Sequence, residues 1–185
     1  MRQARWLAVA LILSITSVAV GDGMAVTLDG LKSTTPADWK EARAMPPMQV
    51  QAFTLPRVEG DEADASLVVF FFGSGSGGSL EDNIKRWKGM VKPPEGKSAA
   101  DATKSDEFAL ADGRVKVSVL DLEGTYLSRV QPMNPSSPVR EMPGYRVVFV
   151  YFNSPNGPYT MRLVGPEKTV AKHLPGFTAW LKNFK

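Results

Sequence analysis

The sequence predicts an α+β sandwich, in which helices pack on a central, mainly antiparallel sheet. Several short segments alternate apolar and polar residues or are rich in β-branched and aromatic side chains, as strands are. Tight turns such as Asp112-Gly113 join neighbouring strands and are typical of antiparallel hairpins. Helical patterns occur before, between and after these strands, so both kinds of element belong to one layered domain.

The domain is expected to begin with one helix and two strands. A Thr-Pro-Ala-Asp segment at 35–38 predicts a helix up to Ala44, with the threonine as N-cap and the proline in the first helical position. Residues 48–55 alternate and predict a half-buried strand, whereas the continuous apolar run at 66–72 is typical of a central strand.

A Gly- and Ser-rich loop at 73–79 leads into the next predicted helix, which Ser79 caps and which ends before Pro93. Apolar residues recur along this helix at the spacing of one helical face, and most of its basic residues lie elsewhere. The apolar stripe comprises Leu80, Ile84, Trp87, Met90 and Val91. The polar segment 92–105 that follows predicts irregular structure.

The remaining strands are expected in two hairpins. Residues 107–111 and 115–122 flank Asp112-Gly113, and residues 145–152 and 159–164 flank a Pro-Asn-Gly-Pro turn.

Two proline-containing segments complete the domain. Four prolines between Ser128 and Gly144 predict a long loop, either ordered or disordered. The chain then ends in helix at 167–174 and 177–184, interrupted by Pro175-Gly176.

The first 25 residues predict a secretory signal peptide. Arg2 and Arg5 precede an apolar run that is shorter than the roughly 20 residues of a membrane span, and small residues follow it. Cleavage is expected after Ala19 or Ala25, which leaves a single domain over 26–185 with no membrane span. The protein is therefore expected to be exported, either to the periplasm or as a secreted protein.

Export changes how the charge is interpreted. The chain has 22 Lys and Arg residues against 19 Asp and Glu residues, a net charge of +3. Loss of Arg2 and Arg5 reduces the charge to +1, or to +2 if Asp22 is also removed. A nearly neutral domain argues against a nucleic-acid partner, which needs a concentrated basic face. The absence of cysteine excludes disulfides and thiolate chemistry.

Several motifs together carry a resemblance to a known group of proteins. They are Thr-Pro-Ala-Asp-Trp (35–39), Met-Gln-Val-Gln-Ala-Phe-Thr-Leu-Pro (48–56), Phe-Phe-Gly-Ser-Gly-Ser-Gly-Gly-Ser (71–79), Asn-Ile-Lys-Arg-Trp (83–87), Gly-Thr-Tyr (124–126) and Leu-Val-Gly-Pro (163–166). Over residues 33–184 the sequence resembles uncharacterised exported bacterial proteins of a planctomycete and proteobacterial type. The resemblance implies a PsbP-like or Mog-type α/β/α sandwich. PsbP and the Mog-type factors are non-catalytic binding modules, but no binding residue transfers by position and fold alone does not fix function.

The Gly-rich loop is the sharpest candidate for a ligand site. A strand that leads through glycines to a helix N-terminus can hold an anion on free backbone N–H groups. However, the loop lacks the Gly-Lys-Ser/Thr of a phosphate-binding loop, and acidic residues follow it, so a tight turn that only seats the helix is the simpler interpretation. The candidate residues are Gly73, Gly75, Gly77, Gly78, Ser79, Asn83 and Arg86.

Two further features give structural expectations. Arg86 is expected to tether its helix, with Asp121 as one possible carboxylate partner. His173 is the only histidine, so it cannot form a multi-histidine metal site, and we expect it to be solvated or to act as a cation near a helix end.

A second candidate surface lies in the proline-rich loop, where Met133, Val139 and Met142 could be presented to a partner. The alternative is a plain surface loop. With no catalytic cluster, metal motif or cofactor motif, the sequence favours a non-catalytic binding or accessory module for a protein partner in the cell envelope. The alternative is a small-ligand or anion binder that uses the Gly73–Ser79 loop. The sequence does not determine the oligomeric state.

Overall fold

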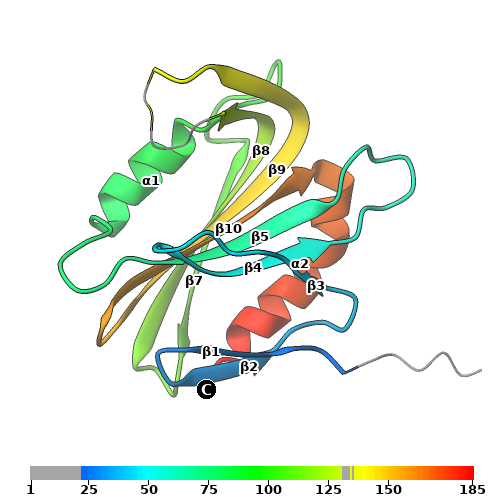
Figure 1. Ribbon diagram of the computed structural model, residues 1–185. Coiled ribbons are helices and arrows are strands. Elements are labelled where there is room, and N and C mark those ends of the chain that lie inside the picture. The colour runs from blue at the N-terminus through cyan, green and yellow to red at the C-terminus, as the bar shows by residue number, and fades with distance from the viewer. Residues whose placement is uncertain (1–21, 131–133, 135) are drawn as a thin grey trace, which may run out of the picture.

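The computed structural model describes residues 22–130, 134 and 136–185, which form ten strands and two helices (Figure 1). The strands are β1 (Ala25–Leu28), β2 (Leu31–Thr34), β3 (Lys40–Glu41), β4 (Gln49–Leu55), β5 (Ala65–Phe71), β6 (Val91–Lys92), β7 (Thr103–Leu110), β8 (Val115–Arg129), β9 (Val139–Ser154) and β10 (Gly157–Pro166). The helices are α1 (Leu80–Lys88) and α2 (Glu167–Lys182).

One antiparallel sheet contains eight of these strands, in the order β3-β4-β5-β10-β9-β8-β6, and β7 also pairs with β8. Strands β7 and β6 pair with successive parts of β8, at residues 115–122 and 125–126 respectively. Strands β1 and β2 form a separate hairpin. The prediction of a mixed α+β fold with a mainly antiparallel sheet is thus confirmed.

Helix α2 covers one face of the sheet through an aromatic core. Trp180 lies within 6.2 Å of Phe53 and 5.4 Å of Trp39, ring centre to ring centre. The β1–β2 hairpin covers the C-terminal end of α2, because Ser33 donates a hydrogen bond to the Trp180 carbonyl and the Lys32 amide donates one to the Lys185 carbonyl. This face is closed by side chains that are almost fully buried.

Helix α1 lies on the opposite face of the sheet (Figure 1). Its Trp87 ring stacks on Phe149 of β9, with the ring centres 4.7 Å apart and the planes 6° from parallel. The predicted apolar stripe packs in this second core, together with residues of β8 and β9. The helix is shorter than expected, because α1 ends at Lys88 and Val91 of the stripe begins β6. The C-terminal part of β8 and the N-terminal part of β9 curve toward α1, as the yellow end of β9 shows in Figure 1.

The helix predicted over 36–44 is wrong, because this segment contains only a turn followed by β3. Thr35 does not cap a helix, since its hydroxyl accepts a hydrogen bond from the Met24 amide. The backbone beyond it pairs instead with β4, as Lys40 lies opposite Thr54 and the Ala42 amide donates to the Ala52 carbonyl. Pairing with a strand distant in sequence has overridden a local helix signal.

The predicted interruption at Pro175-Gly176 is also wrong, because α2 runs through both residues. Val170, Phe177 and Trp180 are buried on both sides of the proline. Burial of each such side chain contributes about 1.5–3 kcal/mol, so together they outweigh the cost of about 3 kcal/mol for a proline inside a helix.

The loop predicted between Ser128 and Gly144 is wrong at both of its ends, since β8 continues to Arg129 and β9 begins at Val139. The register of this pair shifts between Gly124 and Tyr126, opposite Pro143 and Gly144. A bulge has no ladder hydrogen bond to lose, so it can accommodate a proline. Similarly, the segment predicted to be irregular up to Ser105 already contains the start of β7 at Thr103.

The predicted signal peptide lies mainly outside the described residues, as do Met133 and the cleavage site after Ala19. The other predicted cleavage site follows Ala25, which is the first residue of β1 and pairs with Thr34. Among the described residues, no helix combines the length and apolarity needed to cross a membrane.

Candidate functional site

The Gly-rich loop connects β5 to α1 in a conformation that glycine makes possible. Gly73, Gly75, Gly77 and Gly78 all have positive φ angles, between 74° and 90°. The predicted cap is confirmed, because the Ser79 hydroxyl oxygen accepts from the Asp82 amide at 3.1 Å. The same hydroxyl donates to the Asp82 carboxylate at 2.6 Å and holds the pKa of that carboxyl below its ordinary value of 3.8.

Asn83 fixes this loop from inside the protein. Its side chain is 0 % exposed, and its amide nitrogen donates to the carbonyl oxygens of Gly77 and Ser79, each at 2.8 Å. Its amide oxygen accepts a hydrogen bond from Arg86. The loop, the start of α1 and the Arg86 guanidinium are therefore held as one unit.

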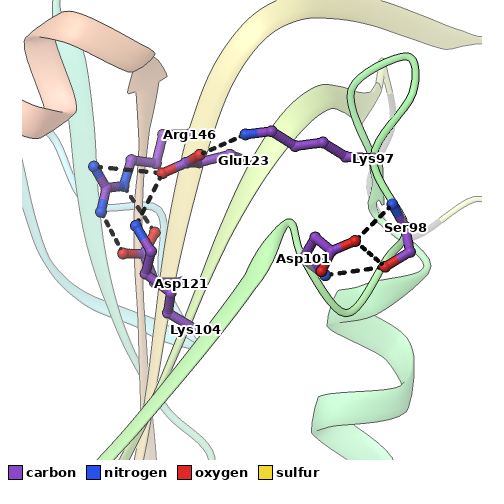
Figure 2. A network of polar contacts seen from close by, with 7 residues as sticks. All are labelled: Lys97, Ser98, Asp101, Lys104, Asp121, Glu123 and Arg146. Atoms are coloured by element: carbon purple, nitrogen blue, oxygen red, sulfur yellow. Dashed lines mark hydrogen bonds and ion pairs between the residues drawn. The ribbon is translucent and has the colours of Figure 1, made fainter.

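Arg86 does not bind Asp121, so the suggested tether between them is wrong. Arg146 of β9 forms a bidentate ion pair with that carboxylate, in which Nε and Nη2 lie 2.8 and 2.5 Å from the two oxygens (Figure 2). This hydrogen bonding raises the pKa of Arg146 above its ordinary value. Glu123 lies beside the pair and also faces Lys97 and Lys104 (Figure 2). The network joins β7, β8 and β9, and its charges are satisfied among themselves.

His173 is buried, and the expectation of a solvated side chain is therefore wrong. It is 4 % exposed, and its Nε2 lies 2.8 Å from the Pro56 carbonyl oxygen and so carries the proton of that hydrogen bond. Its Nδ1 lies 3.7 Å from the Asp38 carboxylate. This position ties α2 to the loop after β4 and is not part of a site. Among residues 22–130, 134 and 136–185, no group of three or more His, Asp or Glu side chains is placed to hold a metal ion.

A groove of 620 Å³ lies on the α1 face of the sheet. It lies between the C-terminal half of α1, the C-terminal part of β8 and the middle of β10. The Leu127 amide donates to the Met90 carbonyl at 2.8 Å and joins β8 to the segment after α1. Residues that line the groove include Lys85, Arg86, Tyr126, Arg129, Val139 and Arg162. We call this cavity the α1 groove.

The lining of the α1 groove is basic. It includes Lys85, Arg86, Arg129 and Arg162, against the single carboxylate of Asp82. The chain thus concentrates positive charge in one concave place, where it can attract an anionic group.

A smaller hollow of 140 Å³ adjoins the α1 groove and shares Arg86, Met90 and Arg162 with it. Its other lining side chains are mainly apolar and include Phe70, Phe72, Trp87 and Phe149. The rings of Phe70 and Phe72 are stacked, with centres 6.3 Å apart. The basic groove therefore adjoins an aromatic hollow, a combination typical of ligand sites.

The structure brings together only some of the residues that the sequence singled out. Arg86 and Val139 both line the α1 groove, although the sequence placed them in separate candidate sites. Met142 packs beside the α1 core. The candidate glycines and Ser79 do not line the groove, and Met133 lies outside the described residues.

Sequence reasoning missed Arg162, although a signal was present. In the strand prediction for 159–164, Tyr159, Met161 and Leu163 fall on one face, and Arg162 falls among the residues of the other. A lone arginine in a central apolar strand deserves an explanation, because burying an unpaired charge is costly.

Comparisons with other proteins give distant structural similarity and no family. No protein-family model matches the sequence, and no curated protein matches it. One similar solved structure is that of PA94 from Pseudomonas aeruginosa, a protein of unknown function, with 12 % identity and a TM-score of 0.47. The match covers 88 % of this chain and 95 % of that chain. We transfer no activity or ligand from it.

Proposed function

We propose that the protein is an exported, non-catalytic binding module that recognises a protein partner in the cell envelope, and that the partner occupies the α1 groove. The observation that carries this proposal is the basic lining of the groove together with the aromatic hollow that adjoins it. A groove of this size accommodates a few residues of an extended segment or one small molecule.

Apolar side chains at the far end of the β8–β9 pair support a protein ligand. Val139, which lines the groove, is 44 % exposed, and Val130 is 69 % exposed. Exposed apolar side chains beside a concave basic surface are typical of a protein-binding face.

The PsbP-like or Mog-type architecture is part of the same proposal. A helix on each face of an antiparallel sheet supports it, as does the location of α1 and α2 in two separate cores. Export also remains a proposal, and the structure favours one of the two cleavage sites. Cleavage after Ala19 leaves β1 whole, whereas cleavage after Ala25 removes its first residue and also Met24, which exchanges hydrogen bonds with Thr35.

The alternative, a small-ligand or anion site at Gly73–Ser79, has less support. The Ser79 hydroxyl is engaged with Asp82, and that carboxylate lies in the first turn of α1. An anion at this helix end would have to approach the negative charge of Asp82.

Site-specific photo-crosslinking in intact cells tests the proposal. A benzophenone amino acid at position 139 lies in the groove, and the same residue at the exposed position Glu59 serves as the control. We expect one defined protein adduct from position 139 and none of that mass from position 59. The purified adduct partner should then bind the purified protein. Identical adduct patterns from both positions, or a partner that does not bind in isolation, would contradict the proposal.

A further inference from the structure

Arg162 occupies a place where a charged side chain is costly. It lies in the central strand β10, with Val68 of β5 and Phe149 of β9 as its direct neighbours in the sheet. It points toward α1, into a region of the sheet that is otherwise mainly apolar. The side chain is half-buried, so its guanidinium loses part of its hydration, which a partner would compensate.

The protein itself offers Arg162 only weak compensation. Its Nη1 donates to the Tyr126 hydroxyl at 3.2 Å, and its guanidinium carbon lies 5.8 Å from the centre of the Phe70 ring. Its Nε is buried and has no acceptor among the residues that the structure describes. Among the described residues no carboxylate lies within ion-pair distance of Arg162.

Arg86 adds a second guanidinium to the same cavity. It lines both the α1 groove and the hollow that adjoins it, as Arg162 does. Asn83, fixed by the glycine loop, accepts its hydrogen bond and thereby orients it. No carboxylate in the described part of the chain forms an ion pair with Arg86 either. Two guanidinium groups thus face a cavity with one lining carboxylate, Asp82, which accepts a hydrogen bond from Ser79.

We infer that Arg162 and Arg86 form a carboxylate subsite, which takes an acidic group carried next to an aromatic or branched aliphatic group. The carboxylate lies against the two guanidinium groups, and the apolar group enters the 140 Å³ hollow over Phe70 and Phe72. This inference rests on the proposed function in one respect: the carboxylate is that of an acidic residue in the partner segment, with a large apolar residue beside it.

Two features favour a carboxylate over a phosphate. The planar fork of a guanidinium matches a planar carboxylate, with two parallel hydrogen bonds. The stacked rings of Phe70 and Phe72 offer nothing to a strongly hydrated phosphate, but they offer a dry surface to an apolar group next to a carboxylate.

Titration by two-dimensional NMR tests the subsite on the purified protein. The probe is 3-phenylpropionate, and the readout is the Arg162 Nε–Hε signal together with the backbone amides of α1 and β10. We expect saturable binding with a Kd on the order of 1 mM, as befits a small fragment. The neutral analogue 3-phenyl-1-propanol should bind at least about tenfold more weakly, since it lacks the charge-assisted hydrogen bonds.

Variants then assign the binding to named residues. Arg162→Met should weaken 3-phenylpropionate binding about tenfold, and Arg86→Gln should weaken it by a smaller factor. Arg43→Gln changes an exposed arginine away from the groove and should leave the Kd unchanged. Should Arg162→Met fail to fold, as judged by near-ultraviolet circular dichroism, Arg86→Gln and Phe70→Ala provide the same test.

Three results would overturn the subsite: no saturable shift at 10 times the expected Kd, equal binding of the acid and the alcohol, or tighter binding of inorganic phosphate than of 3-phenylpropionate. The subsite and the proposed function can fail separately. Binding of 3-phenylpropionate without any crosslinked partner supports the subsite and contradicts the protein-partner function. A partner that binds equally well to the wild type and to Arg162→Met supports the function and contradicts the subsite.

Discussion

The two faces of the sheet differ in how completely they are covered, and two consecutive residues of β10 show the difference. Met161 points to the α2 face, where it is 0 % exposed and packs against apolar side chains. Arg162 points to the α1 face and lines a groove. The α2 face is sealed by a long helix and a hairpin. Helix α1 is short and leaves part of its face open, and the residues there are basic and aromatic. In the proposed function, a core that serves stability and a surface that serves binding share one sheet.

The largest expected effect is a loss of stability on the α2 face. Met161→Ala should lower the free energy of unfolding by about 2–5 kcal/mol, because it opens a cavity in a close-packed core. Urea denaturation measures this loss. Met45→Ala is the matched control, since Met45 is 65 % exposed and its truncation should change stability by less than about 0.5 kcal/mol. A loss below about 1 kcal/mol for Met161→Ala would show that this face is not tightly packed.

The next effect is on the loop that supports the open face. Asn83→Ala should cost about 1–3 kcal/mol in unfolding free energy, because it leaves the Gly77 carbonyl oxygen without its donor and removes one of the two hydrogen bonds that the Ser79 carbonyl oxygen accepts. Amide hydrogen exchange should also speed up in residues 73–79. Ser76→Ala, an exposed change in the same loop, should do neither. Equal exchange in both variants would mean that Asn83 does not hold the loop.

A smaller effect concerns pH at the start of α1. Because Ser79 lowers the pKa of Asp82, the bond between them stabilises the fold above the ordinary carboxyl pKa of 3.8. That contribution is lost as the pH falls below 3.8 and through the lower folded-state pKa. In Ser79→Ala the Asp82 pKa should rise toward 3.8, which NMR titration of the carboxyl carbon measures. An unchanged pKa in this variant would assign the shift to another cause.

Much of the fold could be predicted because its signals are local. Alternation and β-rich runs marked β4, β5 and β10, while Ser79 and the apolar stripe marked α1. The errors arose where distant segments decide the outcome. The segment after Thr35 pairs with β4 instead of forming a helix, and Pro175 is held in α2 by the core on both sides of it.

The candidate site was harder to predict than the fold, for the same reason. Arg86 could be selected from its own helix, but its partner residue in the groove lies on β10, and the Tyr126 hydroxyl comes from β8. No pattern within one segment shows that these three side chains meet. The sequence contained the signal of an isolated arginine in an apolar strand, yet its meaning depends on which residues surround it after folding.

The most direct test of this contrast is the free energy of unfolding of Arg162→Met, measured by urea denaturation. If Arg162 is present for binding, an apolar side chain of similar length should leave stability within about 1 kcal/mol of the wild type, because a poorly compensated charge is removed from the sheet. A loss of more than about 2 kcal/mol would contradict the account. It would show that Arg162 holds the α1 face together, as Met161 holds the α2 face.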